Sequence, residues 1–332
     1  MKIVVFGAGA IGSYVGGLLH AAGQEVTLIG RGAHLAAMRR DGLRLVTEEE
    51  ERVLHPPCTD DASEVGTADI VLVTLKAHSI SGACEAIGTL LGPKTAVLTA
   101  INGMPWWYFY RLEGPWRDRR LASVDPDGRQ WDLIGPERAI GCAVYPTGEI
   151  TEPGRVKIVK HSTLNRLPLG EPDGVRSERA VALSKALIAA GFKAPVIGDI
   201  RTEIWVKLWG NLAFNPISAL TCATLGETAR DPGTRAFARN MMLEAEAVAR
   251  SLGVTMPISI DRRIKGAEGV GAHKTSMLQD LERGRPMEIE PLVGAVIELG
   301  RMVGVATPFI DAVYALICQR AKEAGCYPAP AG

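Results

Sequence analysis

Residues 2–12 read KIVVFGAGAIG and join a short apolar run to three closely spaced glycines. The β-branched run at 2–6 is typical of a buried parallel strand. The segment Ser13–Gly23 is predicted to be a helix that ends at Gly23. A strand, the pattern G-x-G-x-x-G and a helix, in this order, indicate a dinucleotide-binding turn. An ordinary tight turn between strand and helix is the alternative, and the agreement of all three elements favours the binding turn.

The predicted contacts of the dinucleotide are the six residues of this turn: Gly7, Ala8, Gly9, Ala10, Ile11 and Gly12. The first glycine permits the tight turn, the second lets the pyrophosphate approach the backbone, and the third lets the helix pack on the strand. The start of the helix then offers free N–H groups and the positive end of its dipole to the phosphates.

The end of the next predicted strand, Glu25–Ile29, bears on the choice of cofactor. A carboxylate there accepts hydrogen bonds from a ribose hydroxyl and favours NAD, whereas an arginine pairs with the 2′-phosphate of NADP. This chain has Arg31 and no carboxylate between Ile29 and Met38. We therefore predict NADP(H), with a solvated surface arginine as the alternative reading of Arg31.

Two further predicted strands, 69–75 and 96–101, lead into polar side chains. Lys76 follows the first and Asn102 the second. Ligands of parallel sheets bind beyond the carboxyl ends of the strands, so the Lys76 ammonium can reach a cofactor phosphate and the Asn102 amide can hold substrate or ribose. Asn-Gly at 102–103 is also a common turn signal, which leaves a purely structural role open for Asn102.

Length and composition limit the class of protein. A chain of 332 residues predicts two domains, and 47% hydrophobic residues predict a sizeable core. Lysine plus arginine equals aspartate plus glutamate at 37 each, so nothing indicates nucleic acid or an anionic membrane as partner. A strand at residue 2 leaves no room for a signal peptide, and no apolar run is long enough to span a membrane, so we expect a cytoplasmic protein.

Cysteines and histidines give no sign of disulfides or metal. The six cysteines form no CxxC pair, and the six histidines form no HxH or HxxxH pair. We predict free thiols and no metal site. The oligomeric state is left open by the sequence, with a homodimer as one candidate.

The order of the predicted elements indicates an α/β protein with a Rossmann-type doubly wound sheet followed by an all-helical domain. We place the domains at 1–198 and 199–332. Residues 106–140 break the strand–helix alternation and are predicted to be a loop insertion, anchored by the aromatic cluster at 106–110. Strands at 139–145 and 155–160 are predicted to form a hairpin-like edge. A helix is expected at 178–190 and a last strand at 194–197. The helices expected in the second domain are 204–214, 234–251, 276–282, 292–302 and 310–324.

The first of those helices carries Lys207, Asn211 and Asn215 among apolar residues. Steps of four place these three side chains on one helical stripe. Polar groups on a largely apolar helix need partners, and burial lowers the pKa of a lysine, which suits it to donate a proton near neutral pH. A surface lysine with two packing amides is the alternative, in which Asn215-Pro216 ends the helix.

The second cluster runs from Lys274 to Glu290 and contains TSMLQD followed by RPMEIE. Thr275 or Ser276 can cap a helix that starts near Met277, and Gln279 stands where a capping box has its partner for Ser276. This capping role is the alternative to a binding role for the Ser276 hydroxyl.

Four features together resemble the ketopantoate reductase family: GAGAIGS at 7–13, Lys76 after its strand, KLWGNLAFNPISAL at 207–220, and TSMLQDLERGRPMEIE at 275–290. They span both predicted domains in the family's order. The resemblance implies NADPH-dependent reduction of a 2-oxo acid to a 2-hydroxy acid in pantothenate and coenzyme A biosynthesis. It also implies an active site in the cleft between the two domains.

The resemblance further implies roles for individual residues. Lys207 matches the family's catalytic lysine and proton donor, and Asn102 matches an asparagine that touches both cofactor and substrate. Asn211, Asn215 and Ser276 match substrate-binding residues, Glu288 matches an acidic residue that orients the cofactor or the lysine, and Arg31 and Lys76 match the basic pair around the 2′-phosphate.

The chain also departs from the family's pattern. Ile101 stands where glutamine is common, and the segment 106–140 is longer than usual. Two alternatives therefore stay open: a reductase of another branched 2-oxo acid on the same scaffold, and a non-catalytic NADPH-binding sensor.

Overall fold

The computed structural model describes residues 1–159 and 165–328, and its contacts divide the chain into two compact units. The sheet unit comprises Met1–Ile101, Pro105–Arg120 and Asp127–Ile200. The helical unit comprises Asn102–Met104, Leu121–Pro126 and Arg201–Gly332. The chain therefore passes from the sheet unit to the helical unit between residues 200 and 201. Two short segments of the first 198 residues, 102–104 and 121–126, also belong to the helical unit.

The sheet unit is built on a seven-stranded sheet in the order β11-β8-β7-β6-β1-β2-β5. Its strands are β1 Lys2–Phe6, β2 Glu25–Ile29, β5 Cys58–Thr59, β6 Ala68–Val73, β7 Leu91–Thr99, β8 Ala139–Cys142 and β11 Leu169–Gly170. All neighbours are parallel except β11, which pairs antiparallel with β8. Counted among themselves in chain order, the parallel strands follow the order 3-2-1-4-5-6 of a doubly wound dinucleotide-binding sheet. The predicted fold class is confirmed.

A second sheet of four strands, in the order β4-β3-β10-β9, was not predicted. Its members are β3 Leu43–Val46, β4 Glu51–Leu54, β9 Thr147–Glu152 and β10 Arg155–Val159. The hairpin consists of β9 and β10, so the predicted pairing of 139–145 with 155–160 is wrong: β8 lies in the main sheet beside β7. Residue 160, the end of that prediction, lies outside the described residues.

Helix α1, Ala10–Ala21, lies between these two sheets. A side chain at Gly16 would meet Leu28 and Val5 of the main sheet, and one at Gly17 would meet Leu43 of the second sheet. The two glycines thus allow both sheets to pack closely on one helix. The helix begins at Ala10 rather than at Ser13 as predicted, so the third glycine of the turn lies within its first turn.

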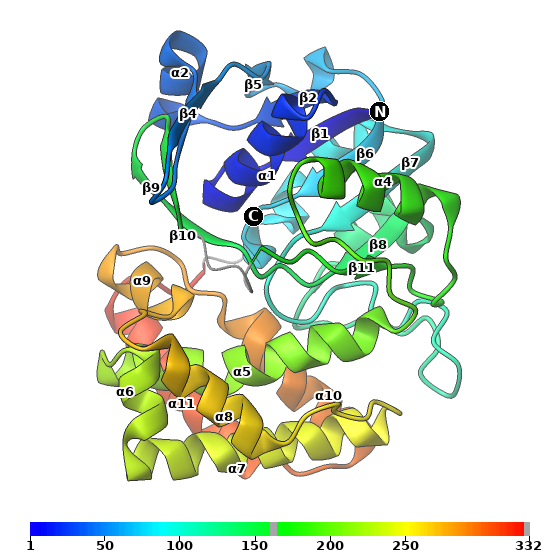
Figure 1. The fold of residues 1–332 in the computed structure, drawn as a ribbon. Coiled ribbons are helices and arrows are strands. Elements are labelled where there is room, and N and C mark those ends of the chain that lie inside the picture. Colours follow the sequence, from blue (N-terminus) through cyan, green and yellow to red (C-terminus); the bar gives the residue numbers. More distant parts are fainter. Residues whose placement is uncertain (160–164, 329–332) are drawn as a thin grey trace. The chain divides into compact units, whose positions relative to one another are not determined.

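The other elements of this unit are short, apart from two helices (Figure 1). They are α2 Gly32–Asp41, η1 Ala62–Glu64, η2 Ala77–Ser79, η3 Ser81–Ala83, α3 Cys84–Gly88, η4 Gln130–Ile134, η5 Pro136–Arg138 and α4 Glu178–Ala189. At 194–197 there is only an isolated bridge from Val196 to Leu169 instead of the predicted strand. The segment 106–140 is anchored as predicted, because Trp106, Trp107, Tyr108 and Phe109 are buried.

The helical unit contains seven α-helices in the described residues and one π-helical turn. They are α5 Ile200–Thr221, α6 Leu225–Arg230, α7 Pro232–Ser251, α8 Ile260–Val270, α9 Ser276–Glu282, η6 Glu290–Gly294, α10 Ala295–Val303 and α11 Pro308–Glu323. The predictions missed α6 and α8. Helix α5 is joined to α7 by the indole of Trp209, which is fully buried and donates to the carbonyl of Met242 at 2.7 Å.

Helix α5 continues through Pro216, so the alternative in which Asn215-Pro216 ends the helix is wrong. Proline removes one backbone donor from a helix, but the apolar side chains of Phe214 and Ile217, one turn apart on the same face of the helix, are buried. Burial of this apolar face outweighs the local preference to stop.

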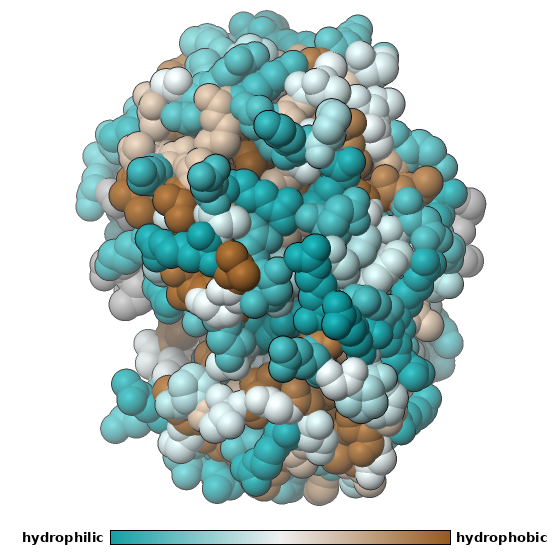
Figure 2. All heavy atoms as spheres, turned by 90° about the vertical axis from the view of Figure 1, so that its right-hand side faces the viewer, coloured by the Kyte–Doolittle hydropathy of each residue, from teal (hydrophilic) through white to brown (hydrophobic). Residues whose placement is uncertain are grey.

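The surface drawn in Figure 2 is mixed, with hydrophobic side chains in separate groups among hydrophilic ones. No helix within the described residues combines the length and apolar character that a membrane crossing needs.

Candidate functional site

The glycine turn is tied to the sheet by hydrogen bonds on both of its sides. Gly7 has φ of +112°, a conformation that favours glycine, and its N–H donates to Ile29 O at 3.0 Å. The N–H of Ala8 donates to the same carbonyl at 2.7 Å. The hydroxyl of Thr74, the residue that follows β6, donates to Gly7 O at 2.7 Å. Thr74 was not predicted as part of this turn, because it comes from a strand distant in sequence.

The other two glycines of the turn differ in the space around them. A Cβ at Gly12 would lie 2.2 Å from Gly7 O and 2.5 Å from Thr74 Oγ1, so no side chain fits there. A Cβ at Gly9 would meet nothing within 4 Å. Gly9 is also the N-cap of α1 and gives no side-chain cap to its amides. An open backbone at an uncapped helix N-terminus fits the pyrophosphate of a dinucleotide.

The predicted basic pair follows the strands that flank β1. Phe6, at the end of β1, is in register with Ile29 of β2 and with Val73 of β6. Arg31 is exposed and precedes α2 as its N-cap, whereas Lys76 is partly buried and precedes η2. The two cations therefore come from the same edge of the sheet as the glycine turn, on either side of β1.

In the helical unit, three of the predicted residues form a chain of hydrogen bonds. The Lys207 ammonium donates to Asn102 Oδ1 at 2.7 Å, and Asn102 Nδ2 donates to Glu288 Oε2 at 3.2 Å. The orientation of the amide follows from its partners, because an ammonium only donates and a carboxylate accepts. Glu288 is 4% exposed. A lysine, an asparagine and a buried carboxylate are thus brought together from positions far apart in the sequence.

The stripe on α5 reaches a second contact further along the helix. Asn215 is buried, and its Nδ2 donates to Ser276 Oγ at 3.4 Å. Asn211 lies between Lys207 and Asn215 on the same helix and is partly buried. Of the two residues that could cap this helix, Thr275 is the N-cap and accepts from Leu278 N, so the alternative in which Ser276 caps through a capping box is wrong. The Ser276 hydroxyl is therefore not used as a helix cap.

The loop that carries Asn102 packs closely on η6. Met104 N donates to Pro291 O at 2.8 Å. Gly103 has φ of +90°, and a Cβ there would lie 2.3 Å from the same carbonyl oxygen. The short segment 102–104 is thus held against the turn that follows Glu288, which keeps Asn102 within reach of both of its partners.

Two residues after Glu288, the carboxylate of Glu290 at the start of η6 is held by two tyrosines that the sequence analysis did not single out. Glu290 Oε1 accepts from the hydroxyls of Tyr314 at 2.7 Å and Tyr327 at 2.9 Å. Burial, followed by the hydrogen bond to Glu290, raises the pKa of Tyr314 and raises that of Tyr327 to about 12. Both phenols therefore remain protonated donors to this carboxylate at neutral pH.

Arg263 is another side chain that the sequence did not single out. Its guanidinium lies against Gly210, where a Cβ would collide with it, within the turn of α5 that separates Lys207 from Asn211. Glycine at this position provides the space. The contact joins α5 to α8, a helix that was itself not predicted, and no local sequence pattern could have indicated it.

The two units offer complementary chemistry. The sheet unit has an open helix N-terminus with flanking cations, which suits a phosphorylated dinucleotide. The helical unit has an ammonium fixed by an amide and a carboxylate, which suits the stabilisation and protonation of an oxyanion. Among residues 1–159 and 165–328, no group of three or more His, Cys, Asp and Glu side chains could hold a metal ion.

Comparison with known proteins gives full-length matches. The family model "Ketopantoate reductase PanE/ApbA" matches residues 3–105, and the model of its C-terminal domain matches residues 199–321. A 2-dehydropantoate 2-reductase of Mesorhizobium japonicum is 55% identical over 328 residues, which is 98% of this chain and 100% of that protein.

Solved structures share the fold. A protein from Ralstonia solanacearum MolK2 is 38% identical, with a TM-score of 0.93 over 98% of this chain and 99% of that one. D-mandelate dehydrogenase, solved with NADH and anilino(oxo)acetate, has a TM-score of 0.82 over 98% and 99% of the two chains. At 23% identity, this last likeness concerns the fold alone.

Proposed function

This chain belongs to the ketopantoate reductase family, a family of pyridine-nucleotide-dependent oxidoreductases, and from that premise we propose that it reduces 2-dehydropantoate to pantoate with NADPH. The observation that carries the proposal is the hydrogen-bonded chain Lys207–Asn102–Glu288. We also propose a cytoplasmic enzyme, since its six cysteines are free.

Lys207 is the proposed proton donor. Reduction of a ketone leaves negative charge on its oxygen, and a fixed ammonium both stabilises that charge and supplies the proton. The Asn102 carbonyl accepts one ammonium proton, and Glu288 in turn holds the amide in the orientation that this requires. This arrangement limits the rotation of the ammonium group without neutralising its charge.

The remaining polar residues on this part of the helical unit are the proposed substrate contacts. Asn211, Asn215 and the Ser276 hydroxyl can all donate hydrogen bonds to a carboxylate. A 2-oxo acid presents its carboxylate next to its ketone, so a site that holds both needs donors near the ammonium. Asn211 and Asn215 follow Lys207 by about one and two turns of α5 and supply such donors.

The proposed holders of the cofactor are Gly7–Gly12, Arg31 and Lys76. Once bound, the reduced nicotinamide supplies the hydride. We infer NADPH rather than NADH because Arg31 follows β2 at the position where a 2′-phosphate is recognised, with no carboxylate beside it.

The test is NADPH oxidation with 2-dehydropantoate, compared with a panel of branched 2-oxo acids and with NADH. Lys207→Ala should lower kcat by about 10²- to 10⁴-fold, as expected for loss of a general acid, while the Kd for NADPH stays unchanged. Lys265→Ala, at an exposed lysine of α8, is the matched control and should keep full activity.

The outcomes separate the alternatives. An active Lys207→Ala enzyme rules out the proposed proton donor. Higher kcat/KM for another 2-oxo acid changes the substrate but keeps the reaction. NADPH binding without turnover of any 2-oxo acid identifies a sensor instead of a reductase.

A further inference from the structure

A histidine in the sheet unit connects the glycine turn to the second sheet. His34 lies in the first turn of α2. Its Nδ1 is 2.9 Å from the N–H of Gly154, in the turn between β9 and β10. Its Nε2 is 3.2 Å from the hydroxyl of Ser13 on α1, and that hydroxyl is 3.2 Å from the carbonyl of Ala8. Three segments, the glycine turn with the start of α1, the first turn of α2 and the turn between β9 and β10, thus meet along one line of hydrogen bonds.

The direction of each hydrogen bond in this line follows from chemistry. The N–H of Gly154 can only donate, so Nδ1 of His34 is the acceptor and carries no proton. The uncharged ring then has its proton on Nε2 and donates to Ser13 Oγ. The Ser13 hydroxyl is left with its own proton to donate to Ala8 O. Burial lowers the pKa of His34, which agrees with an uncharged ring.

One end of the line is the backbone of the glycine turn itself. The N–H of Ala8 is already bound to Ile29 O, so the Ser13 hydroxyl fixes the other side of the same residue. Ser13 is fully buried and its hydroxyl has no access to water that could replace His34. A shift of α2 would therefore alter the hydrogen bond between Ser13 and the carbonyl of Ala8. Ala8 is next to Gly9, whose open backbone leaves space for the pyrophosphate.

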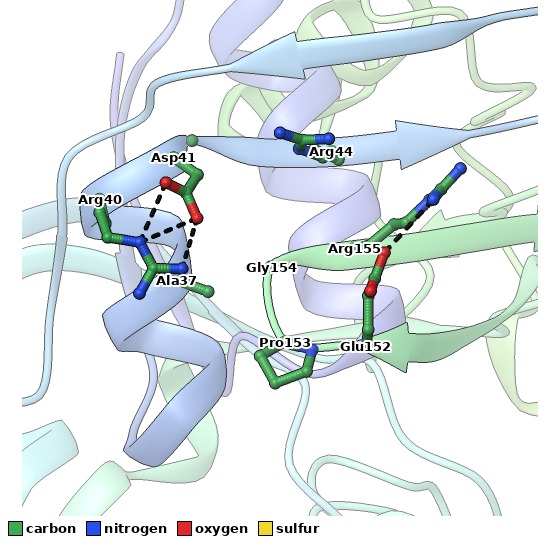
Figure 3. A pocket seen from close by; sticks show the side chains of 9 residues that line it. Ala37, Arg40, Asp41, Arg44, Glu152, Pro153, Gly154 and Arg155 are labelled. Carbon is green, nitrogen blue, oxygen red and sulfur yellow. Dashed lines mark hydrogen bonds and ion pairs between the residues drawn. The ribbon is translucent and has the colours of Figure 1, made fainter.

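The other end is the hairpin turn, which is hydrogen-bonded to β3 and packs closely on α2. Gly154 O accepts from Arg44 N of β3 at 2.8 Å, and a Cβ at Gly154 would lie 3.0 Å from the Cβ of Ala37 on α2, so only glycine allows this close approach. Figure 3 shows this turn beside a surface cavity of about 240 Å³, with Arg40 paired to Asp41 at the end of α2. The hairpin turn is thus tied to β3, and the hydrogen bond from Gly154 to His34 ties it to α2 as well.

We propose that His34 is a positioning residue for cofactor binding, which sets α2 and the glycine turn in one fixed relation. The inference rests on the proposed function. We expect this fixed relation to affect the binding of NADPH most, because Arg31 lies at the start of α2 and Ala8 lies within the glycine turn. A ligand that carries both the 2′-phosphate and the pyrophosphate needs Arg31 and the glycine turn in a fixed relative position, whereas NADH has no 2′-phosphate for Arg31 to bind.

The experiment measures Kd for NADPH and NADH by fluorescence titration of the full-length protein. His34→Ala should weaken NADPH binding roughly five- to tenfold, as the loss of about one net hydrogen bond implies, and NADH binding by less than about twofold. The kcat at saturating NADPH should stay unchanged. His34→Gln should recover most of the affinity, because an amide can accept from Gly154 and donate to Ser13. His20→Ala, on α1, is the matched control.

A double-mutant cycle distinguishes this line of hydrogen bonds from general packing. Ser13→Ala should reproduce the loss of NADPH affinity, and the double variant should lose little more than either single variant. Additive losses, equal losses for NADPH and NADH, or no recovery with glutamine would each overturn the inference while leaving the proposed function intact. A wild-type protein that binds neither cofactor would overturn both.

Discussion

Replacing Gly103 by alanine tests whether the placement of Asn102 controls the chemistry. The residue has φ of +90°, and a Cβ would lie 2.3 Å from Pro291 O and 2.6 Å from Pro291 C. An L-residue with positive φ costs about 1–2 kcal/mol, and overpacking against backbone costs about 1–3 kcal/mol more. Together these give a destabilisation of about 2–5 kcal/mol. With an unfolding entropy near 2.1 cal/mol/K per residue, the Tm of this 332-residue chain should fall by about 3–7 °C.

Activity should fall by more than this loss of stability explains. Relief of the clash must move the segment 102–104 away from Pro291, and with it the amide that accepts from Lys207. A displacement of about 1 Å at a reacting group costs roughly 10²-fold in rate. We expect kcat to drop by this amount at a temperature where the protein is fully folded, with Kd for NADPH unchanged, measured by stopped-flow reduction and fluorescence titration.

A second glycine offers the matched control. Gly114 has φ of +107°, but a Cβ there would meet no atom within 4 Å, so Gly114→Ala introduces backbone strain without the clash. It should lower Tm by about 1–3 °C and leave kcat at the wild-type value. If Gly103→Ala also retained wild-type kcat, the contact between this loop and η6 would have no part in positioning Asn102, and the proposed link between Gly103 and the chemistry would be refuted.

Three further predictions concern other parts of the chain. Arg31→Ala should raise the Kd for NADPH roughly 10- to 100-fold, with the Kd for NADH unchanged, because a charge-assisted phosphate contact is lost; equal effects on both would exclude a 2′-phosphate role. Burial lowers the pKa of His34 from 6.5, so as the pH falls the imidazole is protonated in the unfolded chain before it is protonated in the folded one. The free energy of unfolding should therefore decrease below about pH 6.5. Urea titrations at several pH values should show a weaker pH dependence for His34→Gln. Tyr314→Phe removes one of the two donors to Glu290 and should cost about 1 kcal/mol of stability with kcat within about twofold; a large loss of kcat would assign Glu290 to the chemistry itself.

Sequence patterns predicted those parts of the fold in which neighbouring residues carry the information. Strand β2 has the predicted bounds, and α9 begins and ends where expected, because each is short and bounded by residues that stop it. The second sheet could not be predicted in the same way. No strand was predicted at Glu51–Leu54, which begins with two charged residues. It forms a strand through antiparallel pairing with β3, which pairs in turn with β10 more than a hundred residues later.

Asn102 shows the same limit at the functional site. As the residue after a predicted strand of the main sheet, it would be expected to belong with the cofactor-binding edge, yet its side chain and the two residues after it pack within the helical unit. Local spacing on α5 correctly aligned Lys207 with Asn211 and Asn215, but it gave no sign of what would hold the ammonium. That partner lies 105 residues before Lys207, and it is fixed in turn by a carboxylate 186 residues after it. Because one amide is hydrogen-bonded to both charged groups, a change at Asn102 alters the environment of Lys207 and Glu288 together, and neither charge can be treated as independent of the other.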